Sequence, residues 1–387
     1  MATVPATRLD NPYDYSGERL FPGEFGYSVA SAGDVNGDGY ADLVVGAPFF
    51  SDWQSEFGKD RAFIYHGSES GVATVPATRL DVPDDYADSW FGQSVAWAGD
   101  LNGDGYADLV VGAPFDEDED KGKAFIYHGS ESGVATVPAT RLDNPDDQAD
   151  GHFGYSVAWA GDVNGDGYAD LVVGAPWHSD GDAGEWGDGK AFVYHGSESG
   201  VATRPATRLD NPYDQEGGSF GDSVASAGDV NGDGYADLVV GTPYRRDAFV
   251  YYGNESGVAT RPATRLDNPS GFGQSVAGAG DVNGDGYADV VVGAPYSDAA
   301  YVYHGNESGV ATRPATRLDN PDDQSWGRFG QSVAWAGEVS CNGYLDLGVG
   351  AYWQEDGGRY ERRVLHPFIP SLVIFRTSRS RPCRRRA

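Results

Sequence analysis

The chain has few cysteines, one methionine and no long hydrophobic run. Only two cysteines occur among 387 residues, Cys341 and Cys383, and both lie near the C-terminus. A disulfide framework therefore does not hold the main part of the chain together. Because no run of eighteen apolar residues is present, no hydrophobic helix is long enough to span a membrane. Residues 1 to 10 (MATVPATRLD) also lack the charged and apolar regions of a secretory signal.

Positive charge is also scarce. The chain has 59 acidic against 27 basic residues, a formal net charge of −32 and a pI near 4.3. Such a chain repels phosphates, which argues against nucleic acid as a partner and favours cations. Glycine and tyrosine are abundant instead, with 56 and 23 residues. This composition favours short strands and tight turns over helices.

One acidic segment recurs along the chain. DVNGDGYAD begins at residues 34, 162, 229 and 281, DLNGDGYAD begins at 100, and a degraded copy (EVSCNGYLD) begins at 338. Self-similarity at intervals of about 50 to 65 residues is typical of solenoids, propellers and repeat arrays. We call the five intact copies the acidic loops, which span 34 to 42, 100 to 108, 162 to 170, 229 to 237 and 281 to 289.

Each repeat contains four segments with strand character, similar to FGYSVASAGD, DLVVGAP, AFIYHG and PATRLD. Four antiparallel strands repeated six times predict an all-β fold, a β-propeller of four-stranded antiparallel blades. The repeat count gives six blades, and a truncated seven-bladed propeller is the alternative. We expect residues 1 to 358 to form the propeller, with the segment 5 to 10 closing the last blade.

The two edges of such a blade differ in sequence. In an antiparallel sheet, the loops after the first and third strands lie at one end of the strands, and the loops after the second and fourth lie at the other end. We call these two ends the acidic edge and the variable edge of the sheet. The first kind, the acidic loop and HGSESGVAT, hardly changes between repeats. The second kind, which we call the variable loops, ranges from YRRD at 244 to 247 to a fourteen-residue segment at 177 to 190.

The acidic loops have the pattern of a calcium site. Oxygen-bearing side chains stand at positions 1, 3, 5 and 9, position 7 offers its carbonyl, and the glycine at position 6 permits a sharp turn. The absence of Cys and His disfavours zinc, and magnesium prefers a stricter octahedron. An EF-hand is excluded because position 12 is valine, so Asp at position 9 must close the shell. The alternative is a set of exposed Asx turns, whose like charges would repel one another.

The predicted ligands in the five intact loops are Asp34, Asn36, Asp38, Tyr40, Asp42, Asp100, Asn102, Asp104, Tyr106, Asp108, Asp162, Asn164, Asp166, Tyr168, Asp170, Asp229, Asn231, Asp233, Tyr235, Asp237, Asp281, Asn283, Asp285, Tyr287 and Asp289. A weak sixth site is predicted at Glu338, Ser340, Asn342 and Asp346.

The repeat resembles the FG-GAP repeat, which is found in the propeller of integrin α chains and in many bacterial surface or secreted proteins. The resemblance rests on FG before the first strand, on the acidic loop and on GAP after the second strand, and it covers residues 5 to about 352. It implies Ca²⁺ at the uniform face, ligands at the opposite face and an extracellular or cell-surface location. The six repeats, instead of seven, and the missing secretion signal depart from the family pattern.

The resemblance and the loops together favour a secreted calcium-binding module for protein binding or cell adhesion. The alternatives are a propeller lectin that binds glycans between blades and a structural spacer. We expect no enzymatic activity, because the histidines recur at one position of successive repeats. Candidate ligand-binding residues are the tryptophans in or beside the variable loops: Trp53, Trp90, Trp177, Trp186, Trp326 and Trp353. Trp97, Trp159 and Trp335 share one strand position and are expected to pack internally.

The C-terminal tail breaks the repeat pattern. Residues 359 to 387 contain nine arginines and one glutamate, and we expect them to be irregular. Such a tail is either a basic arm that contacts an anionic surface or a sequence unrelated to the repeat, such as an out-of-frame end.

Overall fold

The computed structural model describes residues 7 to 12, 24 to 48, 60 to 83, 89 to 115, 119 to 179, 187 to 212, 217 to 267, 271 to 321, 327 to 336 and 346 to 351, and the backbone of 371 to 375. The chain divides into two compact units. Unit 1 comprises Met1–Trp159 and Gly167–Arg208, and unit 2 comprises Ala160–Asp166 and Leu209–Ala387.

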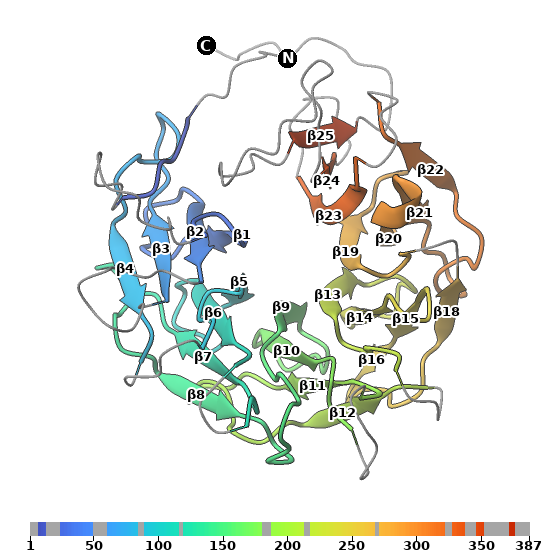
Figure 1. The fold of residues 1–387 in the computed structure, drawn as a ribbon, viewed down its shortest axis with the longest axis horizontal. Coiled ribbons are helices and arrows are strands. Elements are labelled where there is room, and N and C mark those ends of the chain that lie inside the picture. Colours follow the sequence, from blue (N-terminus) through green and yellow to red (C-terminus); the bar gives the residue numbers. More distant parts are fainter. Residues whose placement is uncertain are drawn as a thin grey trace. The chain divides into compact units, whose positions relative to one another are not determined.

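The strands form sheets that follow the repeat, with four strands in each of the first five repeats and three in the last (Figure 1). Unit 1 holds β1 (Val29–Gly33), β2 (Asp42–Ala47), β3 (Arg61–Tyr65) and β4 (Thr78–Asp81) in one sheet, and β5 (Ser94–Gly99), β6 (Asp108–Ala113), β7 (Lys123–Tyr127) and β8 (Thr140–Asp143) in the next. A third sheet, with residues of both units, consists of β9 (Ser156–Gly161), β10 (Asp170–Ala175), β11 (Lys190–Tyr194) and β12 (Thr207–Asp210).

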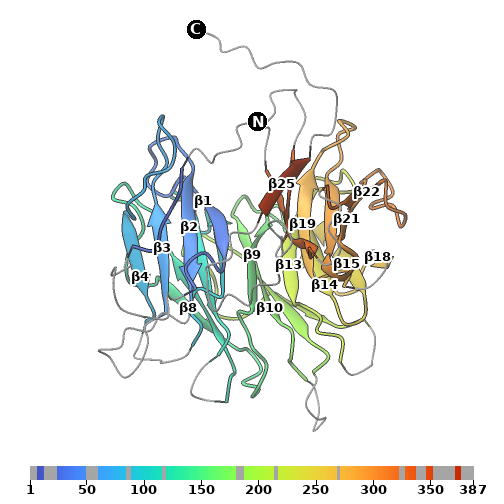
Figure 2. The ribbon, with the colours of Figure 1, turned by 45° about the horizontal axis from the view of Figure 1, so that its top comes forward.

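Unit 2 continues the same arrangement. Its sheets are β13 (Ser223–Gly228), β14 (Asp237–Thr242), β15 (Asp247–Tyr251) and β18 (Thr264–Asp267); β19 (Ser275–Gly280), β20 (Asp289–Ala294), β21 (Ala299–Tyr303) and β22 (Thr316–Asp319); and the three-stranded β23 (Phe329–Trp335), β24 (Leu347–Ala351) and β25 (Ser371–Phe375). A hairpin of β16 (Gly253–Asn254) and β17 (Gly257–Val258) and a 3₁₀ turn η1 (Pro295–Ser297) complete the described elements. The first strands β13 and β19 lie side by side (Figure 2).

Pairing within each sheet is antiparallel and in sequence order, as the repeat predicts. The predicted fold class, an all-β propeller of four-stranded antiparallel blades, is confirmed. The described residues hold one sheet for each of the six repeats. Antiparallel order also places the acidic loop and the turn after the third strand at one edge of a sheet, with the variable loops at the other. The described residues contain no helix long and apolar enough to cross a membrane.

The second and third strands carry the core. All residues of β6 and β7 are buried, and Phe91, from the FG pair before β5, packs edge-on against Phe125 of β7 at 5.8 Å between ring centroids. Edge-to-face packing at this distance stabilises aromatic pairs. The same contact recurs between Phe153 and Phe192 at 5.7 Å. The phenylalanine of FG therefore makes the same core contact with the third strand in these repeats, although the loops between them differ in length.

The FG and GAP segments hold successive sheets together. The Gly154 amide donates to Gly174 of its own GAP segment at 3.0 Å. The Gly154 carbonyl faces the preceding repeat, where it accepts a bond from the Ser94 hydroxyl at 3.1 Å and lies directly over Gly112. A Cβ atom at Gly112 would overlap that carbonyl oxygen. Glycine is thus required in GAP because the backbone of the next repeat occupies the space of a side chain.

The two ends of the chain differ from what the repeat predicts. The described residues 7 to 12 contain no strand, and Leu9 packs against Val45, Phe63 and their neighbours in the first sheet. Closure of the last blade by residues 5 to 10 stays a prediction. The tail was expected to be irregular, but its segment Ser371–Phe375 forms β25, which pairs with β24. The apolar sequence SLVIF accounts for this strand, since it suits an edge position beside a buried strand.

Candidate functional site

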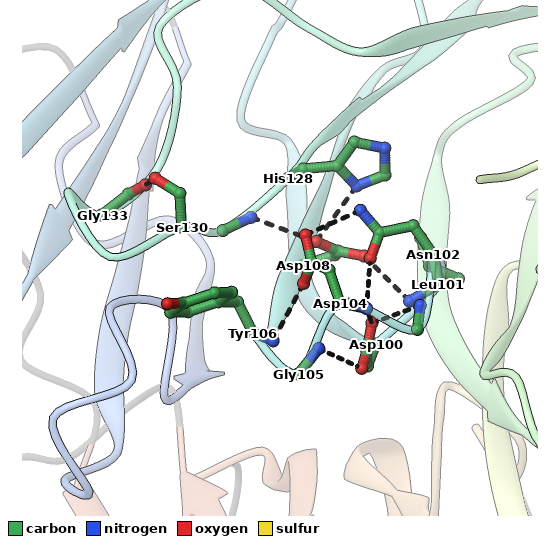
Figure 3. A network of polar contacts seen from close by, with 12 residues as sticks. Asp100, Leu101, Asn102, Asp104, Gly105, Tyr106, Asp108, His128, Ser130 and Gly133 are labelled. Atoms are coloured by element: carbon green, nitrogen blue, oxygen red, sulfur yellow. Dashed lines mark hydrogen bonds and ion pairs between the residues drawn. The ribbon is translucent and has the colours of Figure 1, made fainter. Parts of the chain in front are cut away.

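The second acidic loop shows how the repeated oxygens are arranged (Figure 3). The Asp100 carboxylate accepts backbone hydrogen bonds from Gly103 at 2.7 Å, Asp104 at 3.1 Å and Gly105 at 2.8 Å. The carboxylate of Asp104 accepts the amide of Tyr106 at 3.0 Å. The backbone thus winds around the side chains of positions 1 and 5, which face the inside of the loop.

Position 3 takes part in the same turn. Asn102 Oδ1 accepts the amide of Asp104 at 3.0 Å, and Asn102 Nδ2 donates to Asp104 Oδ2 at 2.9 Å. The bond from the amide at position 6 to the carboxylate at position 1 recurs in the first, fourth and fifth loops. It joins Gly39 to Asp34, Gly234 to Asp229 and Gly286 to Asp281, each at 2.8 Å. In the third loop, which has residues in both units, Asp162 accepts the Gly165 amide at 2.6 Å within unit 2.

The aspartate at position 9 has a different environment. Asp108 is fully buried, and its carboxylate accepts the amides of Leu101 at 2.8 Å and Gly129 at 3.1 Å. It therefore ties the start of its own loop to the turn after β7. Asp42, Asp237 and Asp289 make the same two bonds in their repeats. Sequence reasoning assigned position 9 only to a metal shell and missed this bracing role.

Negative charge accumulates in these loops. Burial raises the pKa of Asp237 to about 7, with a smaller contribution from the charges of Asp233 and Asp229 and against the lowering effect of its two backbone hydrogen bonds. Burial also raises the pKa of Asp42 and of Asp289. A carboxylate that resists ionisation beside other acids indicates a place where positive charge would be stabilising.

One histidine contacts this cluster. Nδ1 of His128 lies 3.1 Å from Asp108 Oδ1, and this hydrogen bond raises the pKa of His128 against the opposing effect of burial. The same YHG position holds His66, His195 and His304 in other repeats. The recurrence at a strand end indicates a part of the blade architecture.

The donor chemistry of the acidic loops fits a hard cation. Each loop offers carboxylate, amide and carbonyl oxygens, and an oxygen that accepts one backbone bond retains a second lone pair. Within the described ranges, however, no three Asp, Glu, His or Cys side chains are gathered closely enough to hold a metal ion. One reason is that position 3 is asparagine and that position 9 faces backbone amides. The predicted calcium ligands therefore remain predictions.

The degraded sixth loop lies mostly outside the described residues. Glu338, Ser340 and Asn342 fall there, whereas Asp346 is described and fully buried. The Asp346 carbonyl accepts the Ala336 amide at 2.9 Å. The buried aspartate matches position 9 of the intact loops, and the weak sixth site stays a prediction.

The variable loops of the second and third repeats bring four rings together. Trp90 lies 4.1 Å from Phe115, Phe115 lies 4.4 Å from His152, and His152 lies 4.0 Å from Trp177, measured between ring centroids. We call these four residues the aromatic stack. His152 is almost fully buried, and burial lowers its pKa to about 4, whereas Trp177 is 36% exposed. All four residues belong to unit 1.

Only part of the predicted tryptophan set lies in the described part of the chain. Trp90 and Trp177 do, whereas Trp53, Trp186, Trp326 and Trp353 fall outside it. Sequence reasoning missed Phe115 and His152. The position of Phe115, directly after GAP, holds an aromatic residue in every repeat, whereas the position of His152, directly before FG, holds a different residue in each repeat; these patterns were the available signals.

The tryptophans of the first strands differ from one another. Trp97 and Trp159 pack together with their ring centroids 4.8 Å apart, as expected of internal residues. Trp335 is 54% exposed, so the expectation of internal packing was wrong there. The repeat position alone therefore does not determine burial.

Comparison with known proteins is consistent with this architecture. The FG-GAP repeat family matches residues 25–63, 91–127 and 153–191, and an FG-GAP-like repeat matches residues 229–292. Integrin alpha-7 of Rattus norvegicus is 46% identical over 172 residues, 44% of this chain and 14% of the integrin. Integrin alpha-5 of Xenopus laevis is 33% identical over 274 residues, 66% of this chain and 24% of the integrin.

The similarity thus spans less than a quarter of the length of these relatives. Among solved structures, the exotype rhamnogalacturonan lyase YesX covers 84% of this chain and 54% of its own, with 14% identity and a TM-score of 0.46, a likeness that carries no functional argument. The repeated FG and GAP contacts, the acidic loops and the matched segments together identify the chain as an FG-GAP repeat protein similar to the integrin alpha chains.

Proposed function

We propose that the chain is a calcium-binding extracellular β-propeller that acts as a protein-binding or adhesion module through its variable loops. The observation that carries the proposal is the difference between the two edges of each sheet. One edge repeats the same acidic loop, and the other presents residues that differ between repeats, including the aromatic stack. Similarity to integrin alpha chains supports a role in adhesion. The proposal includes no catalytic activity.

In this proposal the cations are held by positions 1, 3 and 5 and the carbonyl of position 7, with position 9 contributing from its buried place. For the second loop these residues are Asp100, Asn102, Asp104, Tyr106 and Asp108. Bound calcium supplies the positive charge that the clustered carboxylates lack. The raised pKa of Asp237 supports this reading, because that carboxyl is poorly stabilised as an anion without a cation.

Metal content and thermal melting test the calcium part. We expect about five Ca²⁺ per chain by mass spectrometry after dialysis, and dissociation constants on the order of 10⁻⁴ M, as in extracellular sites. At about 1 mM Ca²⁺ each such site stabilises the folded state by about 1.4 kcal/mol. A melting temperature that does not change between calcium and chelator, with no metal bound, would contradict the proposal.

The ligand part concerns the variable loops. Trp177 is exposed and packs against the buried His152, so the Trp177 ring is both held in place and accessible. Rigid aromatic side chains of this kind are common binding anchors. Trp53, Trp90, Trp186, Trp326 and Trp353 remain further candidates from the sequence.

An array of extracellular proteins tests this part. Trp177→Ala should weaken binding to a captured protein at least tenfold while calcium content stays at the wild-type level. Tyr40→Ala is a matched control, since Tyr40 is an exposed aromatic residue (42%) at the acidic edge and its predicted ligand atom is a backbone carbonyl. Equal losses in both variants would argue against the variable loops. Binding to a glycan array but to no protein would favour the lectin alternative.

A further inference from the structure

Successive acidic loops touch one another, and their contacts point to a role beyond separate cation sites. We propose that the loops are coupled from one repeat to the next, so that cation binding at one loop orders the loop that follows. This inference rests on the proposed calcium function. It concerns contacts within each of the two units.

The first contact joins position 1 of one loop to position 8 of the next. In unit 1, the Asp34 carbonyl accepts the amide of Ala107 at 3.1 Å. Ala107 directly follows Tyr106, whose carbonyl is the predicted ligand at position 7 of the second loop. The first loop therefore holds the peptide group that presents a ligand atom of the second.

The second contact joins position 4 of one loop to position 7 of the next. Gly37 has φ +71°, and a Cβ atom built on it would lie 2.7 Å from Cε1 of Tyr106. The ring of Tyr106 thus packs directly on the backbone of the first loop. In addition, the Val35 carbonyl accepts the amide of Ser130, in the turn after β7, at 3.0 Å.

These contacts recur along the chain. In unit 1 the second loop holds the third through Asp100 and Ala169 at 3.2 Å, with Tyr168 on Gly103. In unit 2 the corresponding contacts join Asp162 to Ala236 at 3.0 Å, Gly165 to Tyr235, Asp229 to Ala288 at 2.9 Å and Gly232 to Tyr287. The repetition indicates one device rather than a chance contact.

The contacts have a direction that determines the coupling. Each loop uses positions 1, 2 and 4 toward the following repeat, and these belong to the turn that a cation would fix. The following loop is held at positions 7 and 8. A cation in one loop therefore fixes the surface on which the next ligand carbonyl is placed, and by linkage the second cation stabilises the first equally.

Hydrogen exchange of residues 100 to 108 in the full chain tests the contact. Gly37→Ala pushes against Tyr106, whereas Gly39→Ala introduces a side chain at φ +89° in the same loop with nothing within 4 Å. Both variants strain the first loop. We expect exchange in the second loop to be at least fivefold faster in Gly37→Ala than in Gly39→Ala. Equal exchange in the two variants would overturn the proposal.

A second variant tests the cation itself. Asp38→Ala removes a predicted ligand of the first loop, whose exposed carboxylate bonds only within its own loop in the contacts described. In 1 mM Ca²⁺ the second loop should exchange at least fivefold faster than in wild type. Asp285→Ala, the same change in the fifth loop, is the control and should leave the second loop unchanged. No effect of Asp38→Ala would show that the loops bind cations independently.

The two proposals fail in different ways. If the wild-type chain binds no calcium, the proposed function fails, and so does the coupling of cation binding. The comparison of Gly37→Ala with Gly39→Ala in chelator still measures whether the loop contacts exist. If calcium binds and both tests show no effect on the second loop, only the coupling fails.

Discussion

The two edges of each sheet use repetition differently. At the acidic edge, the same nine residues return with the same hydrogen bonds, and the buried position 9 closes each loop against the end of the third strand. At the variable edge, only the FG and GAP backbones repeat, while the residues around them differ, as with Phe115 and Trp177. The repeated side chains maintain the blade, and in the proposed function recognition depends on those that are not repeated.

The strongest test of the acidic edge compares two aspartates of one loop. Asp108→Ala leaves the buried amides of Leu101 and Gly129 without their acceptor, and each lost partner costs about 2 kcal/mol. Asp104 is exposed, so Asp104→Ala should cost less than about 1 kcal/mol when no calcium is present. Urea unfolding in chelator measures both. Equal losses would mean that position 9 has no bracing role apart from the metal.

The variable edge can be tested through its only repeated part. Gly112→Ala places a Cβ atom against the backbone of Gly154, and overpacking of this kind should cost about 3 kcal/mol. Gly105→Ala, at φ +89° in open space, carries only the cost of its backbone conformation, about 1 kcal/mol. Thermal unfolding distinguishes the two changes. A Gly112→Ala variant as stable as Gly105→Ala would refute the reading of GAP as a packing contact between repeats.

The sequence predicted the strands well because the same strand pattern recurs from one repeat to the next. The segment DLVVGA became β6 and β10 in full, and AFIY lies within β7. The fourth strand was predicted as PATRLD, but only TRLD is extended, since proline cannot donate to a ladder and lies before the strand. Local patterns were therefore sufficient for the sheets.

The sequence could not predict contacts between repeats. Nothing local to Asp108 indicates that Gly129 donates to it, because that glycine is twenty-one residues away and belongs to another turn. The aromatic stack is a similar case, since Phe115 and His152 come from different repeats. The strand at Ser371–Phe375 was missed because the arginines around it dominated the composition. Such features depend on tertiary structure more than on local propensity.

A smaller effect is expected at the variable edge, where the free energy of unfolding should depend on pH through His152. Burial lowers the pKa of His152 to about 4, against about 6.5 in the unfolded chain, so the unfolded state binds the proton first. The stability due to neutral His152 is fully present above pH 6.5 and decreases as the pH falls toward 4. At pH 5.5 the loss is about 1.4 kcal/mol.

The control for this prediction is His152→Phe, which keeps a ring in the aromatic stack at the same backbone position, where φ is +51°. The free energy of unfolding of the variant should lose less than that of wild type between pH 7 and pH 5.5. Both chains share every other titrating group, so the difference between the two slopes isolates His152. Identical slopes would contradict the prediction, because they would show that His152 binds its proton as readily in the folded chain as in the unfolded chain.

The smallest effect is expected at Tyr194, whose position in the repeat also holds tyrosine in other repeats. Tyr194 ends β11, is fully buried, and its hydroxyl has no hydrogen-bond partner among the described residues; Tyr65, Tyr127 and Tyr251 are the same. Because the hydroxyl makes no hydrogen bond, Tyr194→Phe removes no favourable interaction and should lower the free energy of unfolding by less than about 0.5 kcal/mol. Tyr194→Leu is the control, since it removes the ring that packs against Phe153 and should cost considerably more.

A loss above about 1 kcal/mol in Tyr194→Phe would indicate a buried water that joins the hydroxyl to a neighbouring group. In that case the repeated tyrosines would belong with position 9 as polar braces, whereas a neutral result means that the ring alone explains why they recur.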